Sequence, residues 1–165
     1  MEQPPPAAAP AESGLPPVSV RLAITVVVMS ASLMQVLDST IANVALPHMQ
    51  ATLSATQDSV AWVLTSYIIA SAIATPVTGW LEGRFGRRAL FQAAIVGFTL
   101  SSAACGLAPT LTAMVFARLA QGVFGAFISP LAQSIMLDIY PRDKRALAMT
   151  IWGMGVMIGP ICGPL

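Results

Sequence analysis

Residues 37–47 read LDSTIANVALP. This segment places the carboxylate of Asp38 inside a run, beginning near Arg21, that is otherwise apolar enough to cross a bilayer. An ionised side chain at the centre of a membrane helix costs roughly 2.5–3.5 kcal/mol on insertion scales. Such a residue is usually retained because something charged must be bound, paired or moved. The segment therefore predicts a membrane helix with a functional carboxylate.

The composition points to the same class of protein. Charged residues make up 9% of the 165 residues and apolar residues 56%, whereas soluble domains carry about 25% charged residues. We expect an all-α integral membrane protein, because helices satisfy their own backbone hydrogen bonds in lipid. Residues 1–19 are rich in proline and alanine and lack the basic start and apolar core of a secretory signal. They predict a disordered cytoplasmic leader, followed by a partial transmembrane domain over residues 20–165.

Five apolar stretches follow the leader. About 20 residues span a hydrocarbon core at 1.5 Å per residue, and each stretch is near or above that length. The expected helices cover about residues 21–44, 60–81, 89–107, 111–139 and 146–165. The chain ends inside the last of these apolar runs, so we expect it to be interrupted there.

The basic residues predict the orientation. Arg21 precedes the first stretch, a second group lies between the second and third stretches, and a third group lies between the fourth and fifth; these groups are Arg84, Arg87 and Arg88, and Arg142, Lys144 and Arg145. All three places fall on one side of the membrane, and loops rich in Lys and Arg are cytoplasmic. The sequence predicts a multi-pass protein of the inner or plasma membrane with a cytoplasmic N-terminus.

Arg118 is the exception, because it lies within the fourth apolar stretch. Its depth below the outer edge of the membrane is roughly 12 Å, and that of Asp38 is roughly 8–13 Å. We therefore expect the two charges to pair directly or to face one aqueous cavity. Gln121 shares the helix face of Arg118, and Gln35 shares that of Asp38. These four residues are the candidate proton and substrate coupling site.

A purely structural role for this pair is the alternative. Polar contacts between membrane helices contribute only about 0.6 kcal/mol on average, which is little compensation for burying two charges. A functional role is therefore favoured.

The segment between the second and third stretches reads GWLEGRFGRR over residues 79–88. Its glycines allow a sharp turn, and its arginines can pair with acidic groups, helix C-terminal carbonyls or anionic lipid. From the residues alone it is a cytoplasmic anchor. Its candidate functional residues are Gly79, Glu82, Arg84, Gly86, Arg87 and Arg88.

The fifth stretch carries glycines at four-residue spacing, at Gly155, Gly159 and Gly163. They form a small helix face against which another helix can pack closely. Pro160 removes one backbone hydrogen bond and favours a kink. Whether that bend also controls helix movement stays open at this point. Cys105, in the third stretch, is expected to behave as a small buried hydrophobe.

Together these segments resemble the major facilitator superfamily and, within it, the EmrB/QacA-type drug:proton antiporters with fourteen spans. Residues 37–47 are similar to the helix-one signature of that family, and residues 118–122 to its helix-four motif, whose arginine is associated with proton coupling. Residues 155–164 are similar to the antiporter motif of helix five, and residues 79–88 to the conserved cytoplasmic motif between helices two and three. In that last motif Gly83 stands where the family usually has aspartate, with Glu82 one residue earlier.

The resemblance implies five helices of a major-facilitator N-terminal half, truncated before helix six. The expected function is the N-terminal part of a proton-coupled multidrug efflux transporter that does not complete a transport cycle alone. In its full-length form it would exchange small amphipathic or cationic drugs for protons, with the bilayer around it and a periplasmic adaptor protein as a candidate partner. No cofactor, metal, nucleic acid or enzymatic activity is expected, because no motif combines a nucleophile, a base and a binding site.

One other function stays open. The chain could be a short membrane interaction subunit that assembles with itself, or with a separate second half, through the face of Gly155, Gly159 and Gly163.

Overall fold

The computed structural model describes residues 16–53 and 56–162. Within these ranges the chain is helical and contains no strand. Its elements are α1 (Val18–Leu53), α2 (Gln57–Ala74), the 3₁₀ turn η1 (Thr75–Val77), α3 (Thr78–Phe85), α4 (Arg87–Gly106), α5 (Leu111–Ile139), the 3₁₀ turn η2 (Arg142–Lys144) and α6 (Arg145–Cys162).

Four helical segments are long and apolar enough to cross a membrane: Val18–Val44, Ser59–Phe85, Arg87–Gly106 and Leu111–Ile139. The expected all-α membrane architecture is therefore confirmed. The fifth expected span corresponds to α6, which is not among these four segments, and residues 163–165 lie outside the described ranges.

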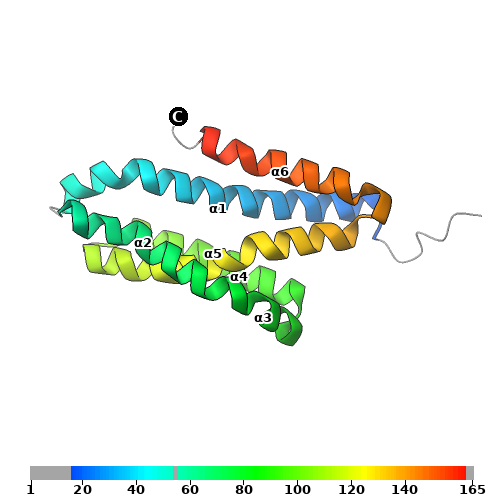
Figure 1. Ribbon diagram of the computed structural model, residues 1–165, viewed down its shortest axis with the longest axis horizontal. Coiled ribbons are helices and arrows are strands. Elements are labelled where there is room, and N and C mark those ends of the chain that lie inside the picture. Colours follow the sequence, from blue (N-terminus) through cyan, green and yellow to red (C-terminus); the bar gives the residue numbers. More distant parts are fainter. Residues whose placement is uncertain (1–15, 54–55, 163–165) are drawn as a thin grey trace, which may run out of the picture.

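Helix α5 is the central element of the bundle. Helices α2 and α4 pack along it, α1 packs against α5, α2 and α6, and α6 lies along α1 (Figure 1). The hydrophobic core forms mainly between α4 and α5, where several large side chains are fully buried; these include Phe98, Ile128, Leu131 and Met136. Since α5 carries Arg118 and α1 carries Asp38, the contact between these two helices positions the candidate site.

Helix α1 is longer at both ends than the expected range of residues 21–44. It begins at Val18, directly after Pro17, whose carbonyl accepts a hydrogen bond from the Arg21 N–H at 3.0 Å. The expected leader therefore ends before residue 18, and residues 1–15 lie outside the described ranges. At the other end α1 continues through Pro47 to Leu53.

The expected loop over residues 79–88 is mostly helix, which corrects that expectation. The second span tightens into η1 at Pro76, which has no backbone N–H to donate, and then continues as α3 to Phe85. Gly79 and Gly83 lie within α3. Gly86 alone makes the turn into α4, with a φ of 81° that side chains other than glycine rarely adopt.

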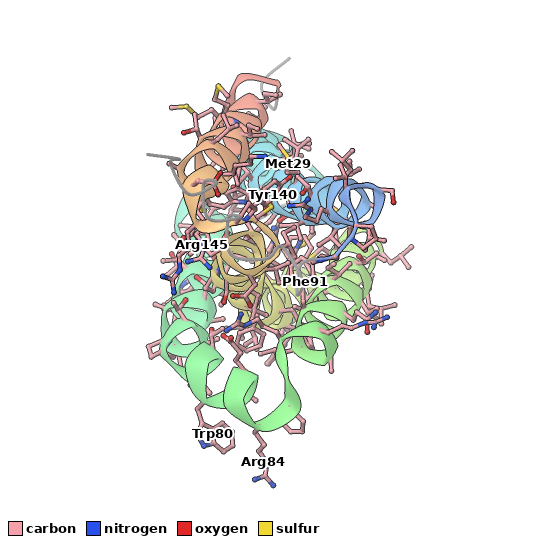
Figure 2. The ribbon with its side chains drawn as sticks, turned by 90° about the vertical axis from the view of Figure 1, so that its right-hand side faces the viewer. Met29, Trp80, Arg84, Phe91, Tyr140 and Arg145 are labelled. Carbon is pink, nitrogen blue, oxygen red and sulfur yellow. The ribbon has the colours of Figure 1, made fainter. Side chains whose placement is uncertain are left out.

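The basic groups lie at one end of the bundle, where α1, α4 and α6 begin and α3 and α5 end (Figure 1). Figure 2 looks onto this end and shows Trp80 and Arg84 on the outer edge of α3, pointing away from the bundle, while Phe91 lies inside it. The segregation of charge that the sequence predicts is thus present in the fold.

Candidate functional site

Asp38 and Arg118 form a direct ion pair between α1 and α5. The Arg118 guanidinium donates through Nη1 to Asp38 Oδ2 at 2.8 Å. The side chains are only 16% and 7% exposed, respectively. A charge pair shielded in this way is little screened by water, and removing one partner would leave the other charge buried and uncompensated. The expected contact is confirmed; its role in coupling remains a prediction.

Gln121 extends this pair along α5. It is fully buried, and its Oε1 accepts a hydrogen bond from the same Arg118 Nη1 at 3.1 Å. The same oxygen also accepts from Cys105 Sγ, on α4, at 3.4 Å. One chain of hydrogen bonds therefore links Asp38 on α1, Arg118 and Gln121 on α5, and Cys105 on α4.

Gln35 joins α1 to α5 in a second place, one helical turn from Asp38. Its Nε2 donates to the Gly125 carbonyl at 2.8 Å, and its Oε1 accepts from Ser129 Oγ at 2.9 Å. Both polar atoms of the amide are thus satisfied across the helix contact. The structure brings all four candidate coupling residues, Gln35, Asp38, Arg118 and Gln121, to the α1–α5 contact.

Tyr67, on α2, belongs to the same region and was not predicted. A Cβ on Gly125, whose carbonyl accepts from Gln35, would lie 2.9 Å from the Tyr67 hydroxyl oxygen. A Cβ on Gly122 would lie 2.5 Å from the backbone carbonyl oxygen of Tyr67. Helix α2 can therefore approach this closely only because positions 122 and 125 have no side chain. A hydroxyl in the middle of the second apolar stretch was the available signal.

Two buried donors in this site have no hydrogen-bond partner among the described residues: Arg118 Nε and Gln121 Nε2. Buried polar groups in proteins are nearly always paired with protein or water. The site therefore has unused capacity to bind acceptor atoms. The described ranges contain no cluster of three or more His, Cys, Asp or Glu side chains that could hold a metal ion.

At the basic end, Arg87 connects three helices. Its guanidinium pairs with Glu82 on α3 and with Asp138 near the end of α5. Gly79, Arg84 and Arg88 of the same motif are exposed. Asp138 was not predicted; the signal that could have identified it is its carboxylate near the end of the fourth apolar stretch, on the same side of the membrane as the arginines.

The glycine face of α6 packs against α1 of the same chain. A Cβ on Gly159 would lie 2.6 Å from Val36 Cγ1, and one on Gly155 would collide with the side chain of Met29, which Figure 2 labels. Trp152 adds a hydrogen bond from Nε1 to Ser32 Oγ at 3.2 Å. Gly159 is buried and Pro160 lies within the helix, while Gly163 lies outside the described ranges. The described part of this face is therefore an internal contact and is covered.

The chain is similar in sequence to known proteins. The chain is 42% identical over 142 residues to the multidrug export protein EmrB of Escherichia coli strain K12, which covers 86% of this chain and 28% of that protein. It is 43% identical over 132 residues to the fatty acid resistance protein FarB of Neisseria gonorrhoeae, covering 80% of this chain and 26% of that protein. The chain thus spans less than a third of the length of these relatives.

A solved structure shares the fold. It is a bacterial homologue of the human lysosomal transporter Spinster, in an inward-facing and unoccupied conformation, with a TM-score of 0.80 over 90% of this chain and 31% of that one. At 22% sequence identity the likeness concerns the fold alone. The family model described as Major Facilitator Superfamily matches residues 28–165. Because that match covers most of the sequence, the chain belongs to the major facilitator superfamily.

Proposed function

We propose that this chain forms the N-terminal part of a proton-coupled multidrug efflux transporter. The observation that carries the proposal is the buried ion pair of Asp38 and Arg118 between α1 and α5. A carboxylate at membrane depth can bind either a proton or a cationic drug, but a proton removes the charge that attracts the cation. Binding of one therefore opposes binding of the other, which is the requirement for antiport.

Arg118 poises this exchange. A neighbouring guanidinium favours the ionised form of a carboxylate, and Arg118 lies 2.8 Å from Asp38. When Asp38 is protonated, the charge-assisted hydrogen bond weakens. Arg118 then keeps Gln121 Oε1 as its acceptor, so that its own charge is not left without a partner. The unpaired donors Arg118 Nε and Gln121 Nε2 can bind water or a polar atom of a substrate.

The relatives support the substrate class. They are named for multidrug export and fatty acid resistance, which suits small amphipathic compounds. Since the chain corresponds to less than a third of their length, we propose that the remaining segments complete the drug cavity and that this chain alone does not transport. The basic end lies in the cytoplasm in this proposal, and a periplasmic adaptor protein is a candidate partner.

Glu82 takes the acidic position of the cytoplasmic motif in this proposal. Its pairing with Arg87, which also binds Asp138, supports that assignment, because the two carboxylates share one guanidinium across three helices. The alternative of a short subunit that assembles through its glycine face is less well supported, since α1 already covers Gly155 and Gly159.

A chimera tests the function directly. Residues 28–165 would replace the matching segment of E. coli EmrB, and drug export would be measured in cells and in proteoliposomes with an imposed proton gradient. Asp38→Asn should abolish gradient-driven export while the amount of protein in the membrane stays the same. The matched control is Asp143→Asn, the same change at an exposed site in η2, which should leave export intact. Unchanged gradient-driven export by Asp38→Asn would refute the proposal.

A further inference from the structure

Cys105 lies in largely apolar surroundings. It is in the last turn of α4, is 7% exposed, and packs in a small apolar cluster with Val63 and Met114. In such surroundings a free cysteine usually acts as a small hydrophobe. Its Sγ is nevertheless directed at Gln121 Oε1, at 3.4 Å.

That oxygen is held between two donors from different helices. A side-chain amide oxygen has two lone pairs, and here one receives Arg118 Nη1 from α5 and the other receives the Cys105 thiol from α4. If the amide turned over, its NH₂ group would face the guanidinium, donor against donor. The thiol therefore helps to hold the carbonyl of Gln121 toward Arg118.

Arg118 Nη1 is shared in turn between two acceptors. It donates to Asp38 Oδ2 at 2.8 Å and to Gln121 Oε1 at 3.1 Å. The position of Gln121 Oε1 thus determines how Nη1 is aimed at Asp38. A change at Cys105 reaches the carboxylate through two intermediate side chains, without contact with the carboxylate itself.

We propose that Cys105 is a positioning residue for the proton site: through Gln121 it fixes Arg118 in the place where the guanidinium stabilises ionised Asp38. The inference rests on the proposed function for its biological meaning. Its physical content is that loss of the thiol donor loosens the pair of Asp38 and Arg118. A neighbouring guanidinium favours the ionised form of a carboxylate, so the effect of a looser pair is sought in the protonation of Asp38.

The charged and titratable groups around Asp38 come from three helices. They are Arg118 on α5, Tyr67 on α2 and Cys105 on α4. On α6, which packs on the other side of α1, the titratable side chain with a described position is Arg145, at the basic end of the helix, where its Nε donates to the Tyr140 carbonyl.

The test is an infrared titration of the 165-residue chain in lipid nanodiscs. The carboxyl band of Asp38 is assigned by its loss in Asp38→Asn, and its midpoint pH is compared between wild type, Cys105→Ala and Cys105→Ser. Alanine removes the donor, while serine keeps a hydroxyl donor in its place. We expect Cys105→Ala to raise the midpoint by about half a pH unit or more, roughly a threefold change in proton affinity. Cys105→Ser should stay close to wild type.

A role in packing alone predicts the reverse order of the two midpoint shifts. Cys105→Ser would then shift the midpoint further than Cys105→Ala, because serine puts a polar group into the apolar cluster while alanine stays apolar. The proposal is overturned if Cys105→Ala titrates as wild type, if Cys105→Ser shifts as far as Cys105→Ala, or if the Asp38 band does not titrate at all. Should Cys105→Ala fail to fold by tryptophan fluorescence, Cys105→Val, which also lacks the donor, is judged by the same criteria. The readout is the protonation of Asp38 itself. A chimera that exports drugs without Asp38 would refute the proposed function and leave this result standing.

Discussion

At the scale of single residues, the ion pair of Asp38 and Arg118 determines what each neighbour can do. Arg118 Nη1 serves both Asp38 and Gln121, so the three side chains are expected to be energetically coupled. Neutralising Arg118 alone leaves the carboxylate buried without its cation, which typically costs about 3–5 kcal/mol. Neutralising both charges removes that penalty.

We therefore predict that Arg118→Gln strongly lowers the unfolding temperature, and that the double variant Asp38→Asn/Arg118→Gln recovers part of the loss. In double-mutant cycles of this kind, residues in contact show coupling energies of about 0.5–3 kcal/mol. The measurement is thermal unfolding in mild detergent, followed by tryptophan fluorescence. If the double variant simply combined the losses of the two single variants, the two charges would not be coupled.

At the scale of helices, the close approach of α2 to α5 depends on Gly122. A Cβ there would lie 2.5 Å from the Tyr67 carbonyl oxygen and 2.9 Å from Ala70 Cβ. Neither atom belongs to a flexible side chain, so the helices must separate. We predict that Gly122→Ala destabilises the chain by about 1–3 kcal/mol, as overpacking usually does.

The matched control for that change is Gly153→Ala in α6, where a Cβ would meet nothing within 4 Å. Alanine is the better helix former by about 1 kcal/mol, so this variant should be at least as stable as wild type. Equal unfolding midpoints for the two variants would show that α2 and α5 are not in tight contact.

The charged cluster at the basic end connects three helices and is partly open to water. Glu82 and Asp138 side chains are 24% and 59% exposed, and ion pairs open to water contribute about 0–1 kcal/mol. We predict that Glu82→Gln and Asp138→Asn each leave the unfolding temperature almost unchanged but reduce drug export by the chimera. Loss of folded protein in either variant would instead assign the cluster a structural role.

At the scale of the whole molecule, the outer faces of the bundle are apolar. Large side chains are more than half exposed along α1, α2, α4 and α5, among them Val26, Ile73, Val96 and Phe116. Water does not favour so much exposed apolar surface, and these faces suit contact with lipid. We predict that the chain stays in the membrane pellet after alkaline carbonate extraction and is released only by detergent.

The orientation is tested with single cysteines in a Cys105→Ser/Cys162→Ser background. A membrane-impermeant thiol reagent should label Pro109→Cys from outside intact cells and Asp143→Cys only after the cells are opened. These positions lie at opposite ends of α5. Labelling in the reverse pattern would place the basic end outside the cell.

Much of this protein followed from the sequence by itself. The all-α membrane architecture, the basic end and the meeting of Asp38 with Arg118 were predicted, because depth along a membrane helix grows by a constant 1.5 Å per residue and unpaired charge is costly in lipid. Asp38 and Arg118 were the two charges expected at that depth, so each was the natural partner of the other.

The tertiary structure added contacts that the sequence analysis did not identify: Tyr67 and Cys105 beside that pair, and Asp138 beside Arg87 at the basic end. A hydroxyl, a thiol or a carboxylate near a helix end is inexpensive enough to occur without a partner, so its presence is only a weak signal of a contact. Likewise the sequence offered three glycines for one turn, and only packing of α3 and α4 selected Gly86. Spacing determines how deep a residue lies, whereas the rotation of each helix about its axis is determined by contact with its neighbours.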